Sequence, residues 1–176
     1  MPPTLSTARL ILTPSNATEL DDFAALNADP AVVGPIGTGV QTREQSWHRL
    51  LRYVGHWQVL GYGNWTVRDT AGLFLGSVGL LDSRRDSVPS FEGEVEAGWA
   101  FMPAAHGRGY AMEACAAMLG WADAHGIART LCMIGPDNAA SLRLAGRLGY
   151  GGGAAGWYAE KAIVLLERAA AVERVT

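Results

Sequence analysis

Lysine, cysteine and charged side chains are all scarce in this sequence. Lys161 is the only lysine in 176 residues, against thirteen arginines, and the formal net charge is −3. A chain with this charge balance lacks the positive surface that nucleic-acid binding requires. The two cysteines, Cys115 and Cys132, lie in apolar stretches with no activating neighbour, so we expect core residues rather than catalytic thiols. The bias toward arginine and alanine suggests a bacterial source.

Long apolar runs are absent as well. No apolar stretch approaches the roughly 20 residues that a membrane-spanning helix needs. Residues 1–4 have neither the basic region nor the apolar region of a signal peptide. A hydrophobic share of 49% with 18% charged residues argues against disorder, and the length suits one domain with a sizeable core. We therefore expect a single domain over residues 1–176, located in the cytoplasm and without a membrane partner.

The apolar pattern predicts strands that alternate with helices. Strands are expected at residues 9–14, 64–68, 73–81, 95–101, 130–134 and 162–166. Helices are expected at residues 18–27, from the capping box at residues 42–45 onward, at 110–125, and after Asn138. The glycine-rich residues 31–40 are predicted to be a linker, and the tail from Gly151 onward gives no clue to a substrate. This order predicts a mixed α/β sheet.

The segment from Glu96 to Ala111 indicates a chemistry. It predicts a buried strand, then a turn containing Gly107 and Gly109, then a mostly buried helix whose N-terminus is held by the core. Glycines let the backbone turn tightly, and the N–H groups and dipole at a helix N-terminus favour an anion such as a pyrophosphate. The spacing matches neither a P-loop nor a Rossmann fingerprint. The alternative is a tight connection without a ligand.

Three stretches resemble one family. The sequence His106-Gly107-Arg108-Gly109-Tyr110-Ala111 resembles the acetyl-CoA motif of GNAT N-acetyltransferases, Gln/Arg-x-x-Gly-x-Gly/Ala, with histidine in the first place. Residues 96–103 resemble the Glu-Ile-Gly-Tyr-Trp-Leu-x-Pro pattern of the RimJ/RimL-like branch, which includes N-terminal acetyltransferases of ribosomal proteins. Residues 5–14 resemble the opening strand of that branch, and residues 138–150 resemble its Asn-x-x-Ser segment.

The resemblance implies a fold and a cosubstrate. The fold would be that of the GNAT acyl-CoA N-acyltransferases, α/β, with a mostly antiparallel central sheet, splayed strands 4 and 5, and flanking helices. Acetyl-CoA would be the cosubstrate, without a metal, and pantetheine would pair with main-chain groups of Phe101 and Met102. Pro103 has no N–H group and would end that pairing. The cofactor-binding residues implied are Phe101, Met102, His106, Gly107, Arg108, Gly109, Tyr110, Ala111 and Asn138.

Acetyl transfer requires a base for the amine, a polarised carbonyl and a stabilised thiolate, while proximity makes a covalent nucleophile unnecessary. For the base we predict Glu96, with Glu94 as second choice. Glu92, Glu94 and Glu96 would share one face of a strand as an acidic wall. Deprotonation through a water chain, without an essential carboxylate, stays open. For Glu92, a solvated charge at the strand end is the favoured alternative.

The acid must differ from the one found in many members of the family. These place a tyrosine seven residues after the motif asparagine, where this sequence has Ala145. Ser141 is the predicted replacement, because its hydroxyl could hydrogen-bond the coenzyme sulfur, and helix capping is its alternative role. Asn138 could cap the same helix, contact pantetheine, or do both.

The function predicted is direct transfer of an acetyl group from acetyl-CoA to a primary amine in a ternary complex. The acceptor would be a protein N-terminus or a small amine such as a polyamine. The alternative is a catalytically silent acyl-CoA-binding sensor or partner module.

The sequence leaves the oligomeric state open, although the resemblance admits a homodimer. We expect most of the large aromatic residues to lie in the core, and one or two of them to line the acceptor pocket, most simply from residues 61–65. The aromatic residues in question are Trp47, Trp57, Tyr62, Trp65 and Trp157.

Overall fold

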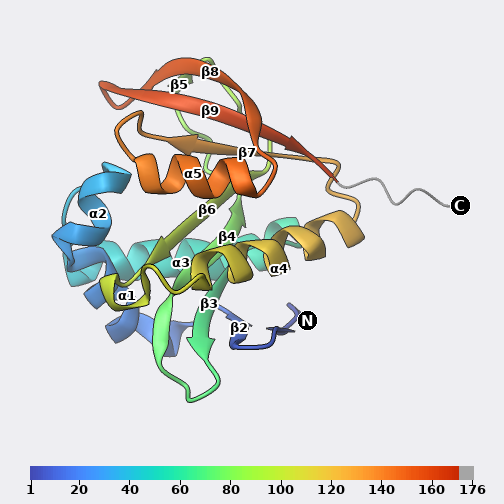
Figure 1. The fold of residues 1–176 in the computed structure, drawn as a ribbon. Coiled ribbons are helices and arrows are strands. Elements are labelled where there is room, and N and C mark those ends of the chain that lie inside the picture. Colours follow the sequence, from blue (N-terminus) through green and yellow to red (C-terminus); the bar gives the residue numbers. More distant parts are fainter. Residues whose placement is uncertain (171–176) are drawn as a thin grey trace, which may run out of the picture.

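The structure, a computed structural model, describes residues 1–170 (Figure 1). Within these residues the strands form one sheet in the order β1-β2-β3-β4-β6-β7-β9-β8-β5. Every neighbouring pair is antiparallel except β6 and β7, which are parallel. The strands are β1 (Leu5–Ser6), β2 (Leu10–Pro14), β3 (Asn64–Asp69), β4 (Phe74–Leu81), β5 (Ser87–Val88), β6 (Glu96–Phe101), β7 (Arg129–Ile134), β8 (Gly151–Tyr158) and β9 (Lys161–Ala169).

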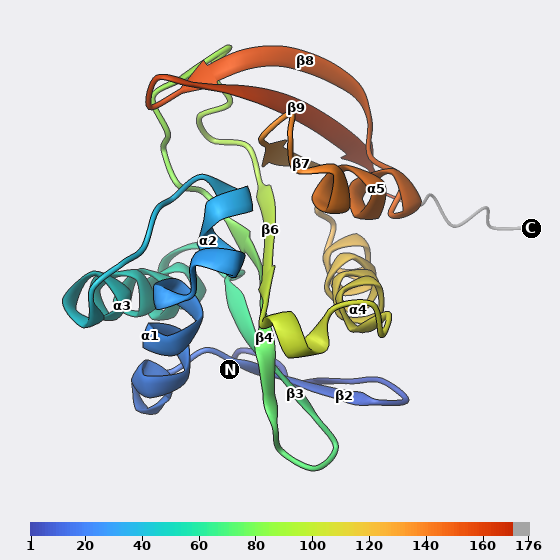
Figure 2. The same ribbon diagram turned by 60° about the vertical axis from the view of Figure 1, so that its left-hand side comes forward.

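Helices cover both faces of the sheet. Figure 2 shows α1, α2 and α3 on one side of strands β4 and β6, and α4 and α5 on the other side. The helices are α1 (Leu20–Ala28), α2 (Pro30–Ile36), α3 (Arg43–Leu60), α4 (Tyr110–Ala124) and α5 (Ala139–Arg147), with 3-10 turns η1 (Ala17–Glu19) and η2 (Pro103–Ala105). The predicted mixed α/β sheet, mostly antiparallel and flanked by helices, is confirmed.

Helix boundaries follow local capping signals. The Thr42 hydroxyl accepts a hydrogen bond from the Gln45 N–H at 3.2 Å, and the Gln45 side chain accepts one from the Thr42 N–H at 2.8 Å, so the predicted capping box is formed. Helix α2 was missed, because glycine content predicted a linker at residues 31–40. The Asp29 carboxylate caps it by accepting from the Ala31 N–H at 2.9 Å, and Pro30 occupies its first position.

The main core lies between α4 and the central strands. Each fully buried aliphatic side chain in it contributes about 1.5–3 kcal/mol relative to exposure. Both cysteines lie in this core, as expected, and burial raises the pKa of Cys132 to about 12, so its thiol stays protonated at neutral pH. Members with no exposed surface include Leu10, Leu12, Trp65, Val67, Val78, Leu80, Ala114, Cys115 and Met118.

Strands β6 and β7 diverge after a single point of pairing. Glu96 pairs with Leu131, the Leu131 N–H donates to the Val95 carbonyl at 2.9 Å, and no later pair follows along the two described strands. These are the strands predicted as fourth and fifth, and the splay predicted between them is present. Because neighbouring main chains separate there, polar backbone groups on the inner edge of β6 are left without a strand partner.

Two differences from the sequence predictions concern the C-terminal hairpin. Strand β8 begins in the glycine run from Gly151, which predicted no strand because it lacks apolar side chains. It forms because its backbone pairs with β9, with a register shift between Gly151 and Ala154. Trp157, which base rates placed in the core, is 60% exposed on β8.

Candidate functional site

The end of β6 leads directly into the glycine turn. The Met102 N–H donates to the Leu75 carbonyl of β4 at 2.9 Å, and the 3-10 turn η2 follows. Gly107 and Gly109 then adopt left-handed conformations, with φ of 71° and 78°, which other residues rarely adopt. Helix α4 starts at the next residue, Tyr110, so the turn places its N-terminus beside the end of β6.

The N-terminus of α4 presents a row of open hydrogen-bond donors. Within the part of the chain that the structure describes, the backbone N–H groups of residues 107–112 have no acceptor. The first bond of the helix runs from the Glu113 N–H to the Gly109 carbonyl at 3.1 Å. A Cβ atom at Gly107 would meet nothing within 4 Å, so the space beside the turn is open. Free donors and a helix dipole together suit a phosphate group.

His106 closes the turn onto the strand. Its Nε2 atom lies 3.0 Å from the Phe101 carbonyl, and since a carbonyl only accepts, Nε2 carries the proton. The sequence left the role of this residue open. In the structure it joins the last residue of β6 to the residue before the glycines, and this fixes the relative position of strand and turn.

Alternation along β6 determines which main-chain groups face the splay. Gly76 pairs with Phe101, and the Met102 N–H bonds to Leu75, so the antiparallel pattern turns the main-chain groups of Trp99 and Phe101 away from β4. These groups face the gap beside β7. Of the two residues predicted to bind pantetheine, Phe101 therefore offers its N–H group, whereas the Met102 N–H is already bonded. The main chain of Trp99 was not predicted.

The next two motif residues help to hold the turn. Tyr110 is buried, and two guanidinium groups contact its ring, with the Cζ atoms of Arg9 and Arg108 at 4.8 and 4.9 Å from its centre. Such cation–π contacts stabilise the arrangement. Ala111 is half-buried and packs against the main core. Arg108 itself is exposed beside the open donors, and its positive charge adds to their attraction for an anion.

Glu96 is held by an arginine. It is 5% exposed, and its two carboxylate oxygens accept hydrogen bonds from Arg85, from Nε at 2.9 Å and from Nη2 at 3.1 Å. Arg85 also donates from Nη1 to the Tyr158 hydroxyl at 3.3 Å. Burial by itself would lower the pKa of Arg85, but the Glu96 charge and these hydrogen bonds outweigh it and raise that pKa. Arg85 therefore stays charged at neutral pH and binds Glu96 through two charge-assisted hydrogen bonds.

The other two predicted acidic residues do not extend the strand. Strand β6 begins at Glu96, so Glu92 and Glu94 lie in the preceding turn and strand alternation does not apply to them. Glu94 pairs with Arg129 at 2.5 Å, and Glu92 pairs with Arg84 at 2.7 Å. Each of the three carboxylates therefore pairs with its own arginine. The row of unpaired carboxylates that the sequence predicted as an acidic wall is not present.

Ser141 and Asn138 meet β6 through Trp99. The Asn138 side chain caps α5 by accepting from the Ser141 N–H at 3.0 Å, and its Nδ2 donates to the Pro35 carbonyl of α2 at 3.1 Å. The Trp99 indole Nε1 donates to the Ser141 hydroxyl oxygen at 3.2 Å. Among the described residues, nothing accepts the Ser141 hydroxyl proton, so that proton is free to bond elsewhere. Ala145, which stands where many family members have the tyrosine, has no exposed surface.

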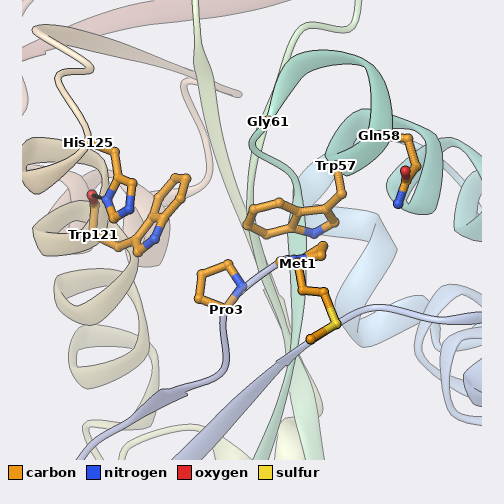
Figure 3. Close-up of a pocket in the computed structure, with 8 residues that line it drawn as sticks. Met1, Pro3, Trp57, Gln58, Gly61, Trp121 and His125 are labelled. Atoms are coloured by element: carbon orange, nitrogen blue, oxygen red, sulfur yellow. Dashed lines mark hydrogen bonds between the residues drawn. The ribbon is translucent and has the colours of Figure 1, made fainter.

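A separate cavity of about 390 Å³ lies at the other end of α4 (Figure 3). Trp57 and Trp121 line it together with the N-terminal residues, and Trp65 packs edge-on against both rings. The fifteen residues of α4 separate this end of the helix from the glycine turn by about 20 Å. Its described lining contains no carboxylate, hydroxyl or thiol, so this cavity is distinct from the site at the splay. Gly61, predicted near the acceptor, lies here.

No group of three or more His, Cys, Asp or Glu side chains in residues 1–170 is arranged to hold a metal ion. None of the helices in the same range is long and apolar enough to cross a membrane.

Comparison with known proteins identifies relatives. The acetyltransferase (GNAT) domain family matches residues 9–151. A solved structure from Bordetella pertussis, described as a GNAT-family acetyltransferase, is 33% identical, with 95% of this chain and 99% of that chain covered and a TM-score of 0.84.

Two more distant structures share the fold. A ribosomal-protein-S5-alanine acetyltransferase from Vibrio fischeri is 15% identical, with 96% and 97% of the two chains covered and a TM-score of 0.73. A spermidine N-acetyltransferase from Vibrio cholerae, solved with CoA and spermine, is 14% identical, with 93% and 97% covered and a TM-score of 0.73.

Proposed function

Because this chain belongs to the GNAT acetyltransferase family, we propose that it is an acetyl-CoA-dependent N-acetyltransferase of the RimJ/RimL-like branch. It would act in the cytoplasm and move the acetyl group directly to a primary amine within a ternary complex. One observation carries the proposal: the open N–H groups of residues 107–112 lie next to the splay between β6 and β7. The open N–H groups suit a pyrophosphate, and the splay suits an extended arm that pairs with a strand.

The coenzyme fits residues from three elements. The main-chain donors of Gly107, Gly109 and Tyr110 would hold the pyrophosphate, together with those of Arg108 and Ala111. The Phe101 main chain would pair with the pantetheine arm, while His106 and Met102 hold that end of the strand in place. Asn138 would border the arm from the start of α5. When bound, the coenzyme supplies the acetyl thioester.

Two groups in this chain would stabilise the charge that develops. An N–H on the inner edge of β6 near Phe101 would bond the thioester oxygen. The free Ser141 hydroxyl proton would bond the departing sulfur, which leaves with the electron pair of the C–S bond. The attacking nitrogen forms the new C–N bond and releases one proton, which neutralises the sulfur. A protonated amine and the thioester thus give an amide, a thiol and one proton to solvent.

The proposed base is Glu96, acting through water. Both of its oxygens are bonded to Arg85, so the proton of the amine would reach it through a water chain rather than by direct contact. Glu94, which bonds Arg129 through one oxygen only, is the second choice. A weakly basic amine suits a site with such a paired carboxylate. The α-amine of a peptide has a pKa of about 7.7–8.0, against about 10.4 for a lysine-type amine. This difference favours a protein N-terminus, or a small α-amine, over a polyamine.

The first experiment measures release of CoA thiol from acetyl-CoA with N-terminal peptides, amino acids, polyamines and aminoglycosides as acceptors. Thiol release that depends on an α-amine supports the proposal. The second candidate function is a silent acyl-CoA-binding module. Coenzyme binding in calorimetry, without turnover on any acceptor, would support this second candidate. Glu96→Ala and Ser141→Ala should lower turnover and keep coenzyme affinity. Full turnover in both variants would contradict their proposed roles.

A further inference from the structure

The turn between β1 and β2 contacts the N-terminus of α4, about a hundred residues further along the chain. Thr7 and Arg9 are the residues of this turn that make the contact, and Glu113 on the first turn of α4 receives it. The opening Thr-x-Arg pattern lies outside the coenzyme motif, and apart from the contact of Arg9 with Tyr110, none of the roles described above accounts for it.

The Glu113 carboxylate is saturated by this turn. One of its oxygens, Oε1, accepts from the Thr7 hydroxyl at 2.6 Å and from the Arg9 N–H at 3.0 Å. The other, Oε2, accepts from Arg9 Nε at 2.7 Å and lies 2.6 Å from Arg9 Nη2. The Thr7 hydrogen bond, followed by the bonds from Arg9, lowers the pKa of Glu113. Two of these four donors, Nε and Nη2, belong to the guanidinium of Arg9, and their shared contact with Oε2 fixes its orientation.

That orientation directs a third nitrogen onto the glycine turn. Arg9 Nη1 donates to the Arg108 carbonyl at 2.9 Å. In a trans peptide the carbonyl and the following N–H point in opposite directions, so this bond turns the Gly109 N–H away from Arg9. Arg9 thereby sets the direction of one of the open donors. A Cβ added at Gly109 would lie 3.4 Å from Arg9 Nη2, so the guanidinium contacts the backbone of the turn closely.

We propose that Arg9 is a positioning residue for the coenzyme: anchored on Glu113 and Thr7, it holds the Arg108–Gly109 peptide so that the turn presents its N–H groups to a pyrophosphate. The inference rests on the proposed function, because it requires the coenzyme to bind at this turn. Arg9 acts through the backbone of the turn, and Glu113 balances its charge.

The test uses Arg9→Gln in the full chain. We expect its Kd for CoA in calorimetry to rise about tenfold, because a charge-assisted network that orders the turn is lost. The second readout is kcat/KM with acetyl-CoA relative to acetyl-pantetheine, a shorter thioester that lacks the pyrophosphate. This ratio should fall about tenfold. Thr7→Val removes only one of the bonds to Glu113, so it should raise the Kd about two- to threefold.

Arg43→Gln is the matched control. Arg43 pairs with Asp21 in an ion pair whose side chains are 61% and 86% exposed, so its loss should leave both readouts at the wild-type value. An Arg9→Gln Kd within twofold of wild type, or equal loss with both thioesters, would overturn the inference. If Arg9→Gln does not fold, an unchanged Kd in Thr7→Val would overturn it instead. Absence of CoA binding in the wild type would refute the proposed function itself.

Discussion

Replacing Trp99 by phenylalanine should slow turnover through Ser141. The substitution keeps an aromatic ring on β6 but removes the N–H that donates to the Ser141 hydroxyl at 3.2 Å. An indole N–H only donates, so this bond makes the serine oxygen the acceptor and leaves its proton for the departing sulfur. A neutral hydrogen bond contributes about 0.5–1.5 kcal/mol net. If it acts fully in the transition state, its loss lowers kcat by about 2- to 13-fold.

A double-mutant cycle isolates this effect from general damage. Thiol release is measured for the wild type, Trp99→Phe, Ser141→Ala and the double variant. Ser141→Ala should lower kcat on the order of 100-fold, and Trp99→Phe should add nothing in that background. Trp157→Phe is the control, because Trp157 is 60% exposed and its indole N–H has no partner in residues 1–170. If Trp99→Phe lowers kcat by the same factor with and without Ser141, the reasoning is wrong.

Further predictions concern the glycine turn and the carboxylates of Glu113 and Glu96. Gly109→Ala should lower the free energy of unfolding by about 1–2 kcal/mol in urea titrations, because φ there is 78°, a left-handed conformation that strains a residue with a Cβ atom. Gly120→Ala is the control: in this open helical position, alanine should raise the free energy of unfolding by about 0.5–1 kcal/mol. Since the pKa of Glu113 is lowered on folding, its stabilisation is present above the pKa of an unfolded glutamate and is lost as pH falls through the folded value. The stability difference between wild type and Glu113→Gln should therefore shrink between pH 6 and pH 3, and a constant difference would contradict this. Arg85→Met leaves the buried Glu96 charge unpaired and should lower the free energy of unfolding by about 3 kcal/mol, with partial recovery when Glu96→Gln is added.

Local patterns account for the parts of the fold that the sequence predicted well. The helix after Gly109 and the strand before Pro103 follow from apolar periodicity and from glycine and proline, which act within a few residues. Strand β8 was missed for the same reason, because pairing with β9 is a tertiary effect and its glycines carry no local strand signal. Helix α2 had a readable signal in Asp29 and Pro30, which the glycine content outweighed.

The candidate site was predictable only in its backbone. The glycine turn could be identified from its own residues, but the partners of its side chains come from distant elements. Arg85 reaches Glu96 from a loop eleven residues away, and the Trp99 bond to Ser141 spans 42 residues. A local sequence pattern carries no information on contacts between side chains that are distant in the sequence. The acidic wall failed for this reason, since each carboxylate has an arginine that alternation along a strand cannot reveal.

Two departures from the family pattern, His106 and Ala145, were the reasons for considering a silent binding module. His106 bonds the Phe101 carbonyl, so the change preserves the junction between strand and turn. Ala145 is completely buried, and a tyrosine there would have to displace core side chains. In the proposed mechanism the Ser141 hydroxyl, whose proton is left free by Trp99, takes the place of such a tyrosine. Neither departure removes a group that the chemistry needs, and this favours an active enzyme over a silent binder.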